Sequence, residues 1–270
     1  MKVGFIGGGT MAEALLGGIL SSNVASAQEI KIGEPVEARR SYLTQTYKVE
    51  TLADNSQAIS NSDLIILAVK PQDLNKVTTE LKPTIKPTQP ALSILAGTKI
   101  PTIKDRLKHS SIIRVMPNTP AQIGCGMSMW TCTPQVDPNM REITQTILSS
   151  IGKEIFIEDE KYLDMATALS ASGPAYVFLF IEALIDAGVY VGLPRDISRT
   201  LALQTVLGST QLVLETGNHP SVLKDMVVSP GGTTAEALQV LEMAGFPGTI
   251  VNAVNSAYQK AISLGKESWR

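Results

Sequence analysis

The sequence predicts an α/β fold, with an N-terminal parallel β-sheet covered by helices on both faces and an all-α C-terminal domain. Short apolar runs alternate with helical patterns over the first half of the chain, as in proteins built from repeated strand–helix units. A glycine cluster follows the first apolar run, and after residue 157 only helical periodicity remains. We place the domains at residues 1–158 and 159–270, with the boundary in the charged segment 158–161.

The strands are expected at short runs rich in Val, Ile and Leu that close at Gly or Pro, and the helices at the amphipathic segments between them. In chain order the expected strands are residues 2–6, 29–33, 48–52, 63–71, 90–97 and 111–117. The expected helices of this half are residues 11–22, 36–47, 72–81 and 101–107.

The second domain is expected to pair with a second subunit. Its helix at residues 174–192 is apolar on nearly every side, although Glu182 and Asp186 interrupt it. Such a helix must be buried all round, and a domain of about a hundred residues offers it little cover. We therefore expect a dimerisation domain, in a homodimer or a larger homo-oligomer built from dimers. The apolar run itself is too short and too charged to be expected to span a bilayer.

Composition excludes several classes of protein. A net charge of −2 argues against a nucleic-acid binder, which carries a basic patch. The two cysteines, Cys125 and Cys132, make no disulfide framework and fit reduced thiols of a cytoplasmic protein. No HExxH or CxxC spacing occurs, so no metal is expected. His109, in an exposed-looking turn, and His219 lack an apparent carboxylate partner and are expected to be structural.

The first glycine cluster fits the GxGxxA form of the dinucleotide fingerprint, at Gly7, Gly9 and Ala12. Gly7 allows the tight turn, Gly9 lets a pyrophosphate approach the backbone, and Ala12 allows close packing of helix on strand. A strand precedes this loop and a helix follows it, which is the setting that the fingerprint requires. We therefore predict a Rossmann-type nucleotide-binding domain.

The residues after the second strand leave the choice of cofactor open between NADPH and NADH. Glu34 stands where an acid accepts a hydrogen bond from the ribose 2′-OH, which favours NADH. Arg39 and Arg40 follow, and an arginine there can neutralise the 2′-phosphate of NADPH. Both arginines can equally be a solvated helix face, and Glu34 can be an ordinary strand-end residue before Pro35.

A second glycine-rich stretch, SPGGTTAEAL at residues 229–238, also leads into a helical pattern. Backbone N–H groups at a helix start bind anions. Pro, Gly and Thr are also the residues of an ordinary turn and helix cap. The pattern alone therefore fits an anion site and a plain cap equally well.

The chain as a whole resembles pyrroline-5-carboxylate reductase, the enzyme family that makes proline. The resemblance is carried by GFIGGGTMAEAL, AVKP, RVMPNTPAQIGCG, SASGPAYVFLFIEALIDAGVYVGLPR and HPSVLKDMVVSPGGTTAEALQVLE. It runs nearly end to end, and SPGGTT is its most specific part. It implies reduction of 1-pyrroline-5-carboxylate to L-proline by hydride from NAD(P)H, the last step of proline biosynthesis. The implied partner is a small molecule, and neither nucleic acid nor a membrane.

The resemblance also implies roles for single residues. It places the substrate on Ser229, Gly231, Gly232, Thr233 and Thr234. The carboxylate is held by the backbone N–H groups of Gly231, Gly232 and Thr233, and Thr234 lies against the substrate nitrogen. A threonine hydroxyl is a poor acid, so catalytic Thr234 is expected to orient the iminium or relay a proton through water. The implied nucleotide contacts are Ile6, Gly7, Gly8, Gly9, Thr10, Met11, Asn55, Ala68, Val69, Lys70, Pro71, Leu95, Ala96 and Gly97, with Asn118 in a loop near the nicotinamide. Family members often have a small hydroxyl residue or an Asn-Arg pair where this chain has Glu34.

Three other functions fit the sequence less well. A hydroxyacid or phosphogluconate dehydrogenase has the same domain order, but its catalytic lysine is missing from residues 174–192. If the chain were a deazaflavin-dependent NADP reductase, the SPGGTT segment would have no assigned role. The same holds for a protein that senses nucleotides but catalyses no reaction. The cofactor preference, the oligomer size beyond a dimer, the range of cyclic imines and the proton source stay open.

Overall fold

The computed structural model describes residues 1–267 and divides into two compact units. The first unit contains Met1–Ser172 together with the chain from Ser256 onward, and the second contains Gly173–Asn255. The first unit continues beyond residue 158 because helix α7 (Lys161–Ala166) packs against strands of the sheet. The domain limits 1–158 and 159–270 stay a prediction, and residues 268–270 lie outside the described part of the chain.

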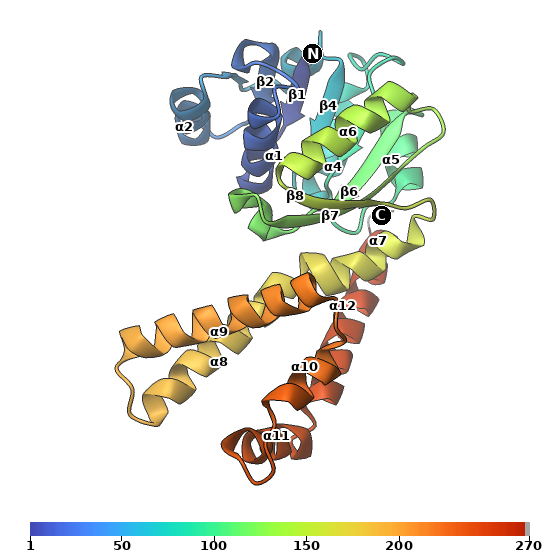
Figure 1. Cartoon of the computed structure of the whole chain (residues 1–270). Helices are drawn as coiled ribbons and strands as arrows, with labels where there is room; N and C mark the ends of the chain where they lie inside the picture. Colours follow the sequence, from blue (N-terminus) through green and yellow to red (C-terminus); the bar gives the residue numbers. More distant parts are fainter. Residues whose placement is uncertain (268–270) are drawn as a thin grey trace. The chain divides into compact units, whose positions relative to one another are not determined.

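A single sheet organises the first unit (Figure 1). Over the described residues it has eight strands in the order β3-β2-β1-β4-β5-β6-β7-β8. The strands are β1 (Val3–Ile6), β2 (Ile30–Gly33), β3 (Glu50–Leu52), β4 (Leu64–Leu67), β5 (Ala91–Ser93), β6 (Ile112–Met116), β7 (Gly126–Cys132) and β8 (Gly152–Phe156). The predicted parallel sheet is confirmed for β1 to β6.

Strands β7 and β8 extend the sheet beyond the prediction. β7 runs antiparallel to β6 and parallel to β8. The link from β6 to β7 consists of a short loop and a 3₁₀ helix, η3 (Thr119–Ile123). Such a short link cannot make the crossover that a parallel neighbour requires, which takes a dozen or more residues.

The sheet buries an apolar layer on each face. The side chains of β4 alternate, so that Leu64 and Ile66 join one core while Ile65 and Leu67 join the other. The first core includes residues of α1 (Thr10–Ser21), α2 (Glu37–Tyr47) and α6 (Pro138–Ser150). The second includes residues of α3 (Asn55–Ile59), α4 (Leu74–Leu81) and α5 (Ile100–Leu107). Each fully buried Leu or Ile contributes roughly 1.5–3 kcal/mol, so these two layers hold the strand ends in place.

The second unit is helical. Its helices are α8 (Gly173–Tyr190), α9 (Arg195–Thr216), α10 (Pro220–Val227), α11 (Thr233–Met243) and the part of α12 (Phe246–Glu267) up to Asn255. α8 has no buried side chain within the described chain, and its Phe178 and Leu179 are 62% and 67% exposed. The apolar helix predicted to need cover is therefore present, and its own chain does not supply that cover.

The helical run that contains α8 is longer than its apolar segment alone. α7, a π-helix η4 (Thr167–Ala171) and α8 follow each other from Lys161 to Tyr190. Judged by length and composition alone, these 30 residues could cross a membrane. Of the most apolar stretch within them, 6% is buried. The expectation that the run is too short to span was made for the apolar segment alone, and the helix that contains this segment begins well before it.

Candidate functional site

The predicted nucleotide residues gather where the strand order reverses. β1 lies between β2 and β4, so the chain leaves β1 toward one side of the sheet and later returns on the other. Ligands of open α/β sheets bind outside the carboxyl ends of the strands at such a point. The loop at residues 7–9 follows β1, residues 68–71 follow β4, and residues 95–97 follow β5. The structure brings these three segments to one edge of the sheet.

Gly7 is required by the fold itself, and Gly8 is closely surrounded. Gly7 has a φ of +93°, and a Cβ there would lie 2.7 Å from the Ala68 carbonyl oxygen. Its N–H donates to the Gly33 carbonyl at 2.8 Å, which joins the loop to the end of β2. A Cβ on Gly8 would lie 2.7 Å from Leu43 Cδ1. Both glycines therefore let the loop pass close to neighbouring segments.

Gly9 differs from Gly7 and Gly8, because nothing in the described part of the chain requires a glycine there. Its φ of −68° and ψ of 179° are open to any residue, and a Cβ would meet no atom within 4 Å. Gly9 is the N-cap of α1 and makes no side-chain cap hydrogen bond. The first N–H groups of a helix have no intrahelical acceptor, so this bare helix start fits the pyrophosphate of a dinucleotide.

Glu34 is directed onto the glycine loop rather than into solvent. It is 8% exposed, and its Oε2 accepts a hydrogen bond from Gly8 N at 2.9 Å. Its Oε1 accepts a hydrogen bond from Val36 N at 2.9 Å. The reading of Glu34 as an ordinary strand-end residue does not account for a buried carboxylate that fixes the second glycine of the loop.

Arg39 and Arg40, at the start of α2, are both held by acceptors of the chain. Arg39 Nε donates to the Gly8 carbonyl at 2.5 Å, and its Nη2 donates to Glu13 of α1. Arg40 Nη1 donates to the carbonyls of Glu34 and Pro35 at 2.9 and 2.8 Å. Neither arginine is therefore simply part of a solvated helix face.

Glu13 is the centre of this polar cluster, and sequence reasoning missed it. Its Oε1 accepts hydrogen bonds from the hydroxyls of Tyr42 and Tyr47 at 2.8 and 2.7 Å, while its Oε2 accepts from Arg39. Burial raises the pKa of Glu13, but these three hydrogen bonds outweigh it, so the pKa lies below its usual value. Burial and the Glu13 carboxylate raise the pKa of Tyr47 to about 12. A surface cleft of about 500 Å³ opens beside these residues.

Asn55 and Asn118, both predicted nucleotide contacts, already use their amides within the chain. Asn55 Nδ2 donates to Glu80 Oε2 at 2.7 Å, and the preceding residue, Asp54, caps α3. Asn118 Oδ1 accepts from Met127 N at 2.8 Å, and its Nδ2 donates to the Ser170 carbonyl at 3.2 Å. Asn118 therefore fastens the loop after β6 to the π-helix η4.

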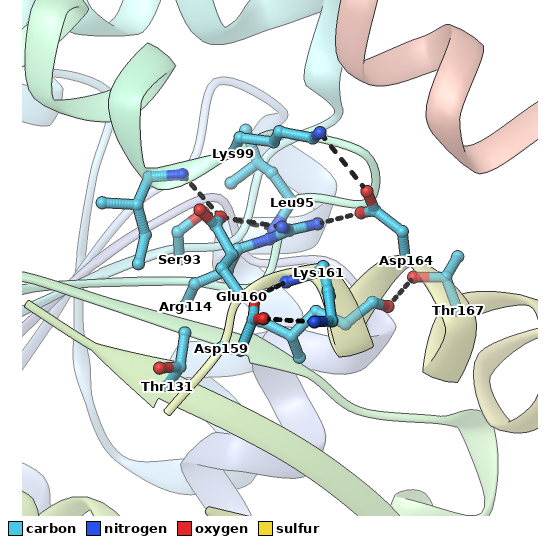
Figure 2. Close-up of polar contacts among 12 residues, drawn as sticks. Ser93, Leu95, Lys99, Arg114, Thr131, Asp159, Glu160, Lys161, Asp164 and Thr167 are labelled. Atoms are coloured by element: carbon cyan, nitrogen blue, oxygen red, sulfur yellow. Dashed lines mark hydrogen bonds and ion pairs between the residues drawn. The ribbon is translucent and has the colours of Figure 1, made fainter. Parts of the chain in front are cut away.

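A buried ion cluster lies beside the loop at residues 95–97 (Figure 2). Arg114 of β6 is 1% exposed. Its guanidinium donates to Glu160 Oε1 at 2.8 Å and to Asp164 Oδ1 at 3.0 Å. Glu160 also accepts from Ile100 N at 2.7 Å, and Lys99 Nζ lies 3.6 Å from Asp164 Oδ2. The cluster joins the sheet, the start of α5 and α7.

The other residues of the loops after β4 and β5 differ in exposure. Lys70 is exposed, whereas the Leu95 side chain belongs to the apolar core, so only its backbone faces the loop. Gly97 has a φ of +69°, and a Cβ there would lie 2.9 Å from Leu264 Cβ at the end of α12.

In the second unit, SPGGTT forms a turn that leads into α11. Gly232 N donates to the Ser229 carbonyl at 3.0 Å, and Gly231 between them has a φ of +68°. This is the pattern of a type II turn, with Pro230 and Gly231 at its centre. The turn itself therefore accounts for Pro230 and Gly231.

The turn also uses the N–H group of Gly232, which was one of the three donors expected to hold the substrate carboxylate. Because the Gly232 N–H is used by the turn, the donors at the start of α11 are the N–H groups of Thr233 and Thr234. Gly232 is the N-cap of α11 and makes no side-chain cap hydrogen bond. The Thr233 side chain is exposed and that of Thr234 is half-buried. This start is therefore uncapped, like that of α1.

The histidines and cysteines lie apart from these sites in the sequence and have local roles. His219 caps α10, since its Nδ1 accepts from Ser221 N at 3.2 Å, which supports the structural reading. His109 is 7% exposed, so the expectation of an exposed turn is wrong, and burial lowers the pKa of its imidazole. Cys125 is exposed, Cys132 is half-buried, and both are free thiols.

Comparison with known proteins gives matches for both halves of the chain. A family model described as pyrroline-5-carboxylate reductase dimerisation matches residues 160–264. A model described as NADP oxidoreductase coenzyme F420-dependent matches residues 2–97.

Full-length relatives and solved structures agree with these models. Proteins named pyrroline-5-carboxylate reductase from Synechocystis sp. and Escherichia coli are 43% and 37% identical to this chain. The alignments cover 99% of both chains in the first case and 98% of both in the second. The crystal structure of Plasmodium falciparum pyrroline carboxylate reductase with NADP bound has a TM-score of 0.89 at 36% identity, over 98% of each chain.

The buried ion cluster gives a stability prediction. Replacing Arg114 by Met leaves the buried Asp164 carboxylate without its main partner, and we expect a loss of about 3–5 kcal/mol in the free energy of unfolding. Urea unfolding measures it. Lys31→Met is the matched control, because Lys31 and Glu50 form an exposed ion pair between β2 and β3 that contributes little. Equal losses in the two variants would contradict the role given to the cluster.

The two kinds of glycine in the loop give a second prediction. Gly9→Ala should keep the free energy of unfolding within about 1 kcal/mol and weaken NADPH and NADH binding by at least about tenfold, because its Cβ occupies the pyrophosphate surface. Gly7→Ala should instead destabilise the fold, since its φ is positive. Calorimetric titration and urea unfolding of both variants check this. Unchanged affinity in Gly9→Ala would remove the pyrophosphate from this helix start.

Proposed function

The chain belongs to the pyrroline-5-carboxylate reductase family, and we propose that its two glycine-capped helix starts divide the family reaction between them. The activity is the reduction of 1-pyrroline-5-carboxylate to L-proline, the last step of proline biosynthesis. The first helix start, at Gly9, serves the cofactor, and the second, at Gly232, serves the substrate.

The cofactor is NADPH or NADH, and a bound nicotinamide supplies the hydride. Gly9, Thr10 and Met11 are exposed or half-buried at the start of α1, and their N–H groups would hold the pyrophosphate. The segments at residues 68–71 and 95–97, at the same strand ends, would line the remainder of the nucleotide. The bare surface of Gly9 is the observation that carries this assignment.

The substrate is a small cyclic imine that carries a carboxylate. The N–H groups of Thr233 and Thr234 point out of the start of α11, where the helix dipole favours an anion by roughly 0.3–2 kcal/mol. The turn at residues 229–232 fixes the backbone before these donors, so they are oriented before the substrate binds. Because the two N–H groups are already oriented, little free energy is lost to backbone reorganisation when the carboxylate binds. Such a pair of donors can therefore hold the substrate in a fixed position.

Thr234 is the residue we assign to the substrate nitrogen. Its hydroxyl is the first side-chain hydroxyl within α11 that is half-buried rather than exposed. A hydroxyl both donates and accepts, so it can accept a hydrogen bond from the protonated imine and relay a proton from water. It would act by orientation, since a threonine does not ionise as an acid at neutral pH.

The second unit pairs with a second copy of the chain. The dimerisation model covers residues 160–264, which include all of α8 and its exposed Phe178 and Leu179. A second subunit would cover these side chains and would also account for the long apolar run from Lys161 to Tyr190. We propose a homodimer, or a larger assembly built from dimers, in the cytoplasm, where the free thiols Cys125 and Cys132 stay reduced.

The deazaflavin-dependent alternative has one supporting observation. The description of the model that matches residues 2–97 includes coenzyme F420. That match stops at the nucleotide half, and it includes neither the SPGGTT segment nor any helix of the second unit. The full-length relatives instead carry the pyrroline-5-carboxylate reductase name over 98–99% of this chain.

The role of Thr234 is tested by kinetics with pyrroline-5-carboxylate. Thr234→Ala should lower kcat by about 10²-fold, while the Kd of NADPH and NADH changes by less than about twofold. Thr234→Ser keeps the hydroxyl and should recover most of the rate. Thr233→Ala is the matched control, because its exposed side chain is not assigned a role. A wild-type rate in Thr234→Ala would remove this hydroxyl from the mechanism.

The subunit interface is tested by charge. Leu179→Glu places a carboxylate on the exposed apolar surface of α8, and burying an unpaired charge is costly. We expect this variant to sediment as a monomer at micromolar concentration, while the wild type sediments as a dimer or larger. Ile155→Glu, on the edge strand β8, should sediment as the wild type does. A monomeric wild type would overturn the proposal.

A further inference from the structure

The Arg39 guanidinium is turned onto the glycine loop by a partner on α1. Its Nε donates to the Gly8 carbonyl, and its Nη2 is bound by Glu13 Oε2. Its carbon atom Cζ lies 4.9 Å from the centre of the Tyr42 ring, so the ring covers one face of the guanidinium. Three groups of the chain, the Gly8 carbonyl, the Glu13 carboxylate and the Tyr42 ring, thus hold Arg39, which is a candidate 2′-phosphate ligand by its place in the sequence.

Glu13 is itself fixed in this position. Its second oxygen accepts from the hydroxyls of Tyr42 and Tyr47. The Glu13 side chain is 19% exposed and that of Arg39 is 27% exposed, so the pair is partly withdrawn from water. An ion pair in this setting is stronger than one on the open surface. Moving Arg39 to a new anion would leave Glu13 without its charged partner.

Glu34 offers the adenosine ribose an acceptor and no donor. An ionised carboxylate has about four lone-pair positions, and two are used by Gly8 N and Val36 N. The remaining positions can accept a hydrogen bond from a ribose 2′-OH. A 2′-phosphate brings about −1.5 to −2 charges and no donor when ionised, so it is repelled by the same carboxylate.

The charges around the ribose position also balance without a ligand. Glu13 and Glu34 carry two negative charges, and Arg39 and Arg40 carry two positive ones. Both arginines already donate to acceptors of the chain. A 2′-phosphate would enter a site without net charge in which Glu13 already pairs with Arg39, whereas a 2′-OH needs no cation.

We propose that Glu13, by holding the Arg39 guanidinium on the glycine loop, acts together with Glu34 to make this chain prefer NADH over NADPH. The inference rests on the proposed function, in which this loop binds the cofactor. Glu34 discriminates by direct contact with the ribose. Glu13 discriminates indirectly, as a positioning residue. It keeps the Arg39 guanidinium on the glycine loop, so that Arg39 does not bind a 2′-phosphate.

The test is calorimetric titration of the full-length protein with NADH and with NADPH, without substrate. Wild-type protein should bind NADH at least about tenfold more tightly, which is the worth of one charge-assisted hydrogen bond. Glu13→Gln keeps the size of the side chain but removes its charge, and should raise NADPH affinity about tenfold while NADH affinity changes less than threefold. Glu37→Gln is the matched control, an exposed acid at the start of the same helix α2, and should leave both affinities as they are.

A double variant shows whether the effect passes through Arg39. Adding Arg39→Ala to Glu13→Gln should abolish the gain in NADPH affinity, because no guanidinium remains to be released. A wild type that prefers NADPH, or a Glu13→Gln gain that survives without Arg39, would overturn the proposal. Should Glu13→Gln fold poorly, Tyr47→Phe, which removes one hydrogen bond to Glu13, must shift the affinity ratio in the same direction.

Turnover separates this inference from the proposed function. Reduction of pyrroline-5-carboxylate that is faster with NADPH at equal low concentrations would reject the cofactor preference and leave the function standing. Tight binding of NADH without turnover of the imine would reject the function and leave the preference standing.

Discussion

The unpaired N–H groups at the start of a helix are the feature on which this account depends. A helix start must find acceptors, and aspartates provide them for α3 and α6 through Asp54 and Asp137. Several other helices, such as α2, α5 and α9, also lack a side-chain cap, but α1 and α11 are the described helices that begin at a glycine N-cap next to a glycine-rich loop. Anionic ligands are the natural acceptors for such starts. The reaction assigned to this family uses two of them, a dinucleotide pyrophosphate and a substrate carboxylate.

The remainder of the structure holds these starts in place. In the first unit, two apolar layers fix the strand ends, Glu34 and Arg39 pin the N–H and carbonyl of Gly8, and Arg114 ties the sheet to α7. In the second unit, the turn at residues 229–232 orients α11. The exposed apolar surface of α8 indicates that the second unit is completed by another copy of the chain.

Local patterns predicted much of this from sequence. The fingerprint residues Gly7 and Gly9 and the six short apolar runs that form parallel strands are local patterns, so the sequence alone predicts them. β7 was missed because its buried residues alternate with half-buried ones and form no apolar run. The cluster of Glu13, Arg39 and Tyr47 joins two helices that are far apart in sequence, and spacing along the chain does not reveal such contacts. The hydrogen bond from the Gly232 N–H within its own turn likewise depends on backbone geometry that the sequence pattern does not show.

Transfer of a labelled hydride from the cofactor to the imine follows the proposed reaction at its chemical step. The purified protein would be given 1-pyrroline-5-carboxylate with NADH or NADPH carrying deuterium at the transferable C4 position, and the product would be analysed by mass spectrometry and NMR. We expect L-proline with one deuterium at C5, the former imine carbon, from at least one of the two cofactors. Proline without deuterium, or no proline despite binding of both cofactors, would contradict it.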